Sequence, residues 1–217
     1  MALLMSLLLS LLLAVFSAII PWVVARVKRG PLVAAFVVGV ALSIASVSFT
    51  LISYPWINLI VLLVSLSAGV LLGRSLPAKT WPFLIVLLVL SVLDITQIVL
   101  SSQAPAPAHV AAIPPTGQLV GNFFLLLPWG RFNIGLFDIF IIAAISEHAR
   151  KRGLTFVLAL LPSVLGIVLA FAFRQFIYNG TLPLIPFLTI GWICDLALVS
   201  WYRQRVRAAR SQVAAEI

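Results

Sequence analysis

Two aspartates lie inside apolar stretches of this 217-residue chain, where acidic side chains are rare. Asp94 stands in "SVLDITQIV" and Asp138 in "GLFDIFII", and no Lys or Arg lies within a helical turn of Asp138. An ionised side chain at bilayer depth costs about 2.5–3.5 kcal/mol on insertion scales. Acids in such positions are therefore expected to have a partner or a function.

Two facing carboxylates can catalyse hydrolysis. Like charges a few ångströms apart cannot both ionise, so the pair shares one proton near neutral pH. One carboxylate then acts as a base toward water while its protonated partner polarises a carbonyl, as in aspartic proteases. Two other roles stay open from the residues alone. The pair could be a polar contact between helices, or a proton relay in a proton-coupled transporter.

The composition indicates what surrounds these acids. Hydrophobic residues make up 63% of the chain and charged residues 9%, whereas a soluble domain carries about 25% charged residues. We therefore expect an integral membrane protein in contact with the lipid bilayer. The formal charge of +9 does not indicate nucleic-acid binding. The basic residues form short clusters between apolar runs, as in loops that face the cytoplasm and anionic lipid.

Seven apolar runs are long enough, or nearly so, to be membrane-spanning helices of about 20 residues. We expect a single transmembrane domain over residues 1–202 and a basic cytoplasmic tail over 203–217. The first run is interpreted as a retained helix and not a cleaved signal peptide, because its basic residues follow the apolar stretch. In the third run, Gly69 and Gly73 predict close packing against a neighbour. The seven runs are 3–25, 32–53, 57–73, 82–100, 132–149, 154–177 and 183–202.

The loops between these runs alternate in charge. By the positive-inside rule, the basic loops face the cytoplasm. This pattern predicts a multi-pass protein with its N-terminus outside and its C-terminus in the cytoplasm, located in the cell membrane if the organism is a prokaryote. The basic loops and the tail contain Arg26, Lys28 and Arg29; Arg74 and Lys79; Arg150, Lys151 and Arg152; and Arg203, Arg205, Arg207 and Arg210.

The topology places the two aspartates at one depth. Asp94 lies six residues before the outer end of the fourth run, and Asp138 lies six residues after the outer start of the fifth. With a helical rise of about 1.5 Å per residue, both are about 9 Å below the outer boundary. The two runs are consecutive and antiparallel, so we expect the carboxylates to face each other.

Three segments resemble motifs of presenilins and signal peptide peptidases, the intramembrane aspartyl proteases. "GLFDIFII", from Gly135 to Ile142, is similar to their GxGD segment, and "SVLDITQIV" to their other aspartate helix. "LPLIPF" is similar to their PALP segment. The order of the three segments is also that of the family. Two positions depart from the pattern, since Phe137 stands where the family has glycine and Leu93 where it often has tyrosine.

The resemblance implies a function and a fold. Asp94 and Asp138 would be the catalytic residues of an enzyme that needs no cofactor or metal. The fold would be an all-α polytopic bundle of seven transmembrane helices, presenilin-like but lacking two N-terminal spans. "NFFLLLP", from Asn122 to Pro128, would be a short extended segment before the second aspartate helix. The residues expected to bind substrate are Pro183, Leu184, Ile185, Pro186, Gly135 and Phe137.

The expected orientation refines the substrate class. A cytoplasmic C-terminus is similar to signal peptide peptidase and opposite to presenilin. The resemblance then implies transmembrane peptide substrates of type II orientation, such as remnant signal peptides. The proline segment has two interpretations from physics alone. Pro183 and Pro186 could keep the chain extended beside an extended substrate, or they could simply start a helix.

The remaining polar residues carry weaker signals. Glu147 and Glu216 are expected to be solvated charges, and Asp195 a polar packing contact or a residue of an inner vestibule. Cys194 is expected to pack as a small apolar residue. His109 and His148 have no partners at metal-ligand spacing, so no metal is expected. The Pro- and Ala-rich residues 101–117 are expected to form a mobile external loop.

Overall fold

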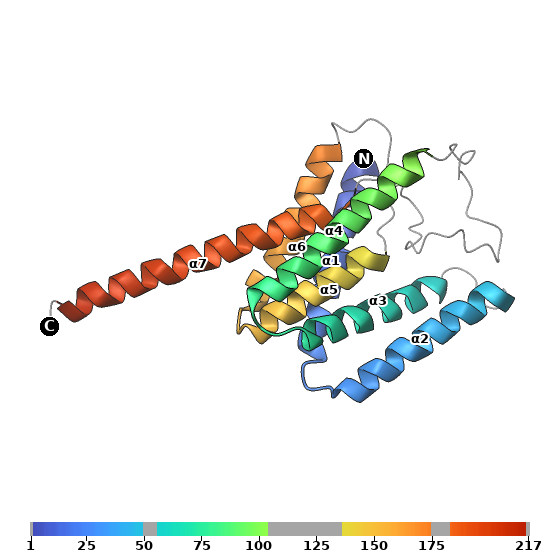
Figure 1. Ribbon diagram of the computed structural model, residues 1–217, viewed down its shortest axis with the longest axis horizontal. Coiled ribbons are helices and arrows are strands. Elements are labelled where there is room, and N and C mark those ends of the chain that lie inside the picture. Colours follow the sequence, from blue (N-terminus) through green and yellow to red (C-terminus); the bar gives the residue numbers. More distant parts are fainter. Residues whose placement is uncertain (1, 50–55, 104–135, 175–182, 216–217) are drawn as a thin grey trace.

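Seven α-helices and no strands make up the part of the chain that the computed structural model describes, residues 2–49, 56–103, 136–174 and 183–215 (Figure 1). The predicted all-α class is therefore confirmed for these residues. The segment "NFFLLLP", Gly135 and His109 lie outside them. The helices are α1 (Ala2–Val23), α2 (Arg29–Phe49), α3 (Trp56–Ser75), α4 (Thr80–Gln103), α5 (Leu136–Lys151), α6 (Phe156–Arg174) and α7 (Ile185–Ala215).

Two of these helices contain a segment long and apolar enough to cross a bilayer. The segments are Phe156–Phe173 in α6 and Ile185–Tyr202 in α7. Four further helices contribute shorter apolar segments within the described residues, namely Leu7–Val23, Arg29–Ala45, Leu59–Ser75 and Thr80–Thr96. By length and composition, the described residues thus support two of the seven predicted spans.

Helix α7 continues well past the predicted end of the last span. It runs to Ala215, so most of the basic tail expected from residue 203 onward is helical. The sequence after Tyr202 contains no Gly or Pro and is rich in Arg, Ala and Gln, which are good helix formers. In Figure 1 this part of α7 projects away from the other helices.

Helix α5 is the central helix of the bundle. It packs against α1, α3, α6 and α7, and every residue from 141 to 149 is buried. The main core cluster joins Ile142 and Ile145 of α5 to Phe83 and Leu87 of α4. Because α5 is enclosed, any charged residue within 141–149 must find a partner inside the protein.

Glycines allow the closest helix approaches, as the sequence predicts for α3. A Cβ atom on Gly69 would collide with the carbonyl oxygen of Phe140, and one on Gly73 would lie 2.8 Å from the Cβ of Glu147. Small residues four apart on one helix face let two backbones come together in this way. The predicted close packing of this glycine pair is confirmed, with α5 as the neighbour.

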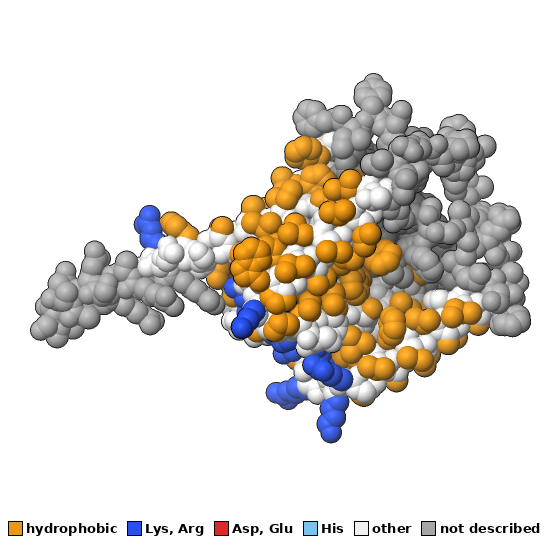
Figure 2. All heavy atoms as spheres, in the orientation of Figure 1, with side chains coloured by type: hydrophobic (Ala, Val, Ile, Leu, Met, Phe, Trp, Pro, Cys, Tyr) orange, Lys and Arg blue, Asp and Glu red, His pale blue; other side chains and the backbone are white. Residues whose placement is uncertain are grey.

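The surface divides into an apolar body and one basic end. Figure 2 shows hydrophobic side chains over most of the visible described surface, with Lys and Arg near the α1–α2 turn and the start of α4, and also on the projecting part of α7. Large apolar side chains stand exposed on several helices, among them Leu12, Val37 and Ile85. We use "basic end" for the end of the bundle where α1, α3 and α5 finish and α2 and α4 begin. Its basic residues are Arg26, Lys28, Arg29, Arg74, Lys79, Arg150, Lys151 and Arg152.

Candidate functional site

Asp94 on α4 caps the first turn of α7. Its Oδ2 accepts a hydrogen bond from the backbone N–H of Ile185 at 3.2 Å. The carbonyl of Leu184 accepts the first helical bond, from Leu188 at 3.0 Å, so Leu184 occupies the N-cap position. A leucine side chain offers no acceptor to the free N–H groups there, and Pro186 has no N–H. The carboxylate of Asp94 supplies the acceptor from another helix, where the helix dipole favours negative charge.

The face of α4 that carries Asp94 is directed toward α7. Phe83 and Leu87 are fully buried on this face, and Ser91 follows one turn later. The hydroxyls of Ser91 and Thr189 lie 2.9 Å apart in a hydrogen bond between the two helices. Residues at this helical spacing share a face, so Asp94 continues the buried stripe that begins at Phe83.

Asp138 lies in the first turn of α5 and is half-buried. At helical spacing it shares a face with Ile142 and Ile145. Both isoleucines belong to the core cluster that includes Phe83 and Leu87 of α4. Asp138 therefore stands on the stripe of α5 that contributes to the same core cluster as Phe83 and Leu87, which lie on the buried face of α4 that carries Asp94.

A ring contact relates the heights of the two acids. Phe83 of α4 stacks on His148 of α5, with ring centroids 4.3 Å apart and planes at 4°. Both acids lie farther from the basic end than this ring pair. Asp94 is eleven residues from Phe83 along α4, and Asp138 is ten residues from His148 along α5. These spacings correspond to about 16 Å and 15 Å of helix. The two acids thus have nearly the same height, and direct contact between their carboxylates stays a prediction.

The remaining predicted site residues fall into two groups. Leu184 and Ile185 are buried at the start of α7, beside the Asp94 carboxylate. Pro186 belongs to the first helical turn, and the described residues that precede α7, Pro183 and Leu184, are not helical. The helix-start interpretation therefore holds for Pro186. Phe137, in contrast, is 53% exposed on the surface of α5.

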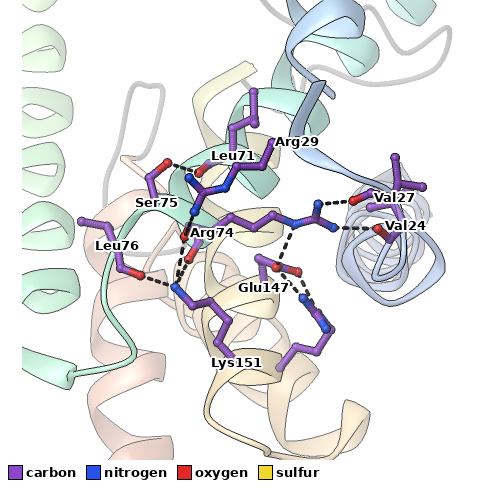
Figure 3. A network of polar contacts seen from close by, with 11 residues as sticks. Val24, Val27, Arg29, Leu71, Arg74, Ser75, Leu76, Glu147 and Lys151 are labelled. Atoms are coloured by element: carbon purple, nitrogen blue, oxygen red, sulfur yellow. Dashed lines mark hydrogen bonds and ion pairs between the residues drawn. The ribbon is translucent and has the colours of Figure 1, made fainter. Parts of the chain in front are cut away.

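Glu147 corrects an expectation from the sequence. It was expected to be solvated, yet it is fully buried. Its Oε1 accepts hydrogen bonds from Arg74 Nε at 3.2 Å and Arg150 Nη2 at 2.7 Å, and its Oε2 accepts one from Arg150 Nε at 2.9 Å (Figure 3). These hydrogen bonds raise the pKa of the Arg150 guanidinium above its usual value. A buried carboxylate is stable here because two guanidinium groups enclose it.

The cations around Glu147 also cap helix C-termini. Arg74 donates to the carbonyls of Val24 and Val27 at 2.6 Å each, where α1 ends. Lys151 donates to the last carbonyls of α3, including that of Arg74 at 3.1 Å, as Figure 3 shows. Basic side chains satisfy the free carbonyls of helix ends and complement their negative dipole. The sequence indicates each charge but not this pairing between distant helices.

Two further expectations concern α7. Asp195 is 2% exposed, and its Oδ1 has no hydrogen-bond partner among the described residues. Cys194, expected to pack as a small apolar residue, is exposed on the surface of α7 and is not part of the described core. Among the residues that the structure covers, no three His, Cys, Asp or Glu side chains gather as a metal site.

Comparison with known proteins found no matching family model, no matching curated protein and no matching solved structure.

Proposed function

We propose that this chain is an intramembrane aspartyl protease in which Asp94 and Asp138 activate water against a transmembrane peptide. The observation that carries the proposal is the hydrogen bond from Ile185 N–H to Asp94 at 3.2 Å. It joins two of the three segments on which the family resemblance rests, although they are 91 positions apart in the sequence. The third segment is "GLFDIFII", and the nearly equal heights of its Asp138 and of Asp94 along their helices support its place in the same site.

The chemistry requires a pair of carboxylates that holds one proton. The ionised member takes a proton from water, which attacks the scissile carbonyl, while the protonated member donates a hydrogen bond to the carbonyl oxygen. The tetrahedral intermediate then collapses and its C–N bond breaks as the proton taken from water passes to the leaving amine, so that the pair again holds one proton. A helical substrate shields its peptide bonds within its own hydrogen bonds, so the substrate must be unwound. The non-helical entry at Pro183 and Leu184 offers a neighbouring backbone for such an extended segment.

The membrane setting of the proposal rests on surface chemistry. Phe137, Ile85 and Leu93 are each more than half exposed, and they lie on the same helices as the two acids. Exposed apolar side chains in this number suit contact with lipid. The proposed topology retains the predicted orientation, with the basic end in the cytoplasm, so the substrates are type II transmembrane peptides.

One observation favours a second, non-catalytic role for Asp94. A carboxylate that caps a helix has a structural task, and that task needs no second acid. In this alternative the chain is a non-catalytic membrane protein or a proton-coupled transporter, and Asp94 and Asp138 are polar contacts or relay groups.

Substitution by asparagine separates the two roles. Asn is as good a helix cap as Asp but cannot exchange a proton. The purified protein is reconstituted in liposomes with a type II transmembrane peptide, and product formation is followed for the wild type, Asp94→Asn and Asp138→Asn. We expect each variant to fold and to lose cleavage, and the double variant to be no worse than either single one, because the acids act as a unit.

Asp195→Asn is the matched control, because it changes a buried acid on α7 far from Ile185. We expect this control to retain substantial activity. Cleavage by the wild type and equally by Asp94→Asn and Asp138→Asn would refute the aspartyl mechanism. A wild type that cleaves none of a panel of type II peptides would favour the non-catalytic role.

A further inference from the structure

His148 lies in the interior of the bundle. It is 0% exposed, and neither Nδ1 nor Nε2 has a partner among the described residues. Its ring stacks on Phe83 and lies 5.9 Å from the ring of Trp192 on α7. A buried polar group without a partner costs about 1–3 kcal/mol, and the large majority of buried polar groups in proteins are hydrogen-bonded to the protein or to ordered water.

Asp195 is a second orphan on the facing helix. Its carboxylate is 2% exposed, and Oδ1 lacks a partner in the described part of the chain. It stands on the buried stripe of α7 between Trp192 and Val199. Residues on one stripe of a helix face the same neighbouring surface, so the contacts of Trp192 and Val199 show which part of the bundle Asp195 faces.

The contacts of the stripe bring Asp195 opposite His148. Trp192, one turn before Asp195, contacts the His148 ring. Val199, one turn after it, belongs to the same apolar cluster as Ala149, the next residue of α5. Asp195 therefore faces the turn of α5 that contains His148. By helical rise the pair lies about 15 Å from Asp94, toward the basic end.

We propose that His148 and Asp195 form a second polar site that binds water between α5 and α7. A neutral imidazole has one N–H donor and one acceptor nitrogen, and a carboxylate oxygen accepts. Water both donates and accepts, so a single molecule can bond to the ring and to Oδ1 at once. The proposal does not depend on protease activity.

The local charges favour a neutral ligand over an ion. Arg152, four residues after His148, is close enough for its charge to act on both His148 and Asp195, and Lys151 acts on His148 as well. The nearest contacts on α4 and α7, Phe83 and Trp192, carry no charge. The negative charge of Asp195 is thus already opposed by Arg152, and a metal cation at this site would be repelled by Arg152 and Lys151.

The test uses the fact that the chain has two histidines. In a His109→Gln background, ¹⁵N-histidine labelling reports on His148 alone. Magnetisation transfer from water to the His148 ring N–H is measured by NMR in nanodiscs. We expect clear transfer, and its loss in Asp195→Leu, which removes the carboxylate that holds the water. Ser163→Ala removes another buried hydroxyl that lacks a partner among the described residues, on α6, and should leave the transfer unchanged.

Three outcomes would overturn the proposal. The first is absence of water contact at His148 in the folded protein, and the second is transfer that persists in Asp195→Leu. If Asp195→Leu does not fold, Asp195→Asn replaces it, and the ring nitrogen resonances of His148 should then shift because the bridging acceptor has changed. The third outcome is unchanged resonances in that variant.

Discussion

The carboxylate of Asp94 and the backbone N–H of Ile185 are 3.2 Å apart, so an acid in the middle of α4 caps the first turn of α7. The N-terminus of α7 lacks a side-chain cap of its own, since Leu184 precedes it and Pro186 follows. The position of Asp94 is therefore determined by a hydrogen bond as well as by packing. In a protease such a bond would orient one member of the catalytic pair.

Asp94→Ala should lower the free energy of unfolding by about 1 kcal/mol, because the helix loses its cap. Asp94→Asn should be close to the wild type, since the amide oxygen can accept the same bond. Thermal or chemical unfolding in detergent measures both variants. Equal destabilisation by Ala and Asn would contradict the capping role, because Asn preserves the acceptor.

Glu147→Ala should lower the unfolding free energy by about 3 kcal/mol, because it leaves Arg74 and Arg150 without their common acceptor. Glu147→Gln keeps the shape and one acceptor oxygen, so its effect should be smaller. Lys79→Gln, an exposed cation at the same end, is the control and should have little effect. A Glu147→Ala protein as stable as Lys79→Gln would show that the network adds no stability.

Gly69→Ala should destabilise the protein by about 1–3 kcal/mol, because the new methyl group meets the Phe140 carbonyl and must separate α3 from α5. Gly30→Ala is the matched control, since a Cβ there has no neighbour within 4 Å. That change should leave stability unchanged or slightly raised, because Ala favours helix over Gly. The α3–α5 contact would need revision if both variants unfolded alike.

The rate of peptide cleavage should fall at both acidic and alkaline pH. The proposed pair works with one shared proton, and it stops when it holds two protons or none. A pH–rate profile on reconstituted protein, with circular dichroism at each pH to verify folding, measures this. A rate that rises steadily across the range would argue against a pair with one shared proton.

The basic end should face the cytoplasm. A reporter fused to the C-terminus should therefore be cytoplasmic, and one inserted near Pro107 should be external, as the charge pattern predicts. Accessibility to an impermeant label in intact cells tests both positions. External labelling of the C-terminus would reverse the orientation and move the expected substrates from type II to type I.

Much of this protein is determined by local sequence. Long apolar runs separated by basic clusters predict the helices, and each described helix overlaps one of those runs, although α7 continues to Ala215. The pair Gly69 and Gly73 predicts a close helix contact, which α3 and α5 make. The heights of Asp94 and Asp138 also follow from counting residues along helices. All of these are properties of one segment at a time, governed by hydropathy and helical rise.

Tertiary structure decided which distant groups meet. The burial of Glu147 depends on α1 and α3 enclosing the end of α5, and its sequence neighbours "HARKRG" suggest solvent instead. The approach of Asp94 to Ile185 depends on the packing of α4 against α7. The same packing buries His148 and Asp195, whose ring nitrogens and Oδ1 have no hydrogen-bond partner among the described residues. Hydrogen bonds and ion pairs between helices arise only when those helices are placed side by side. No periodicity within one helix encodes its partners.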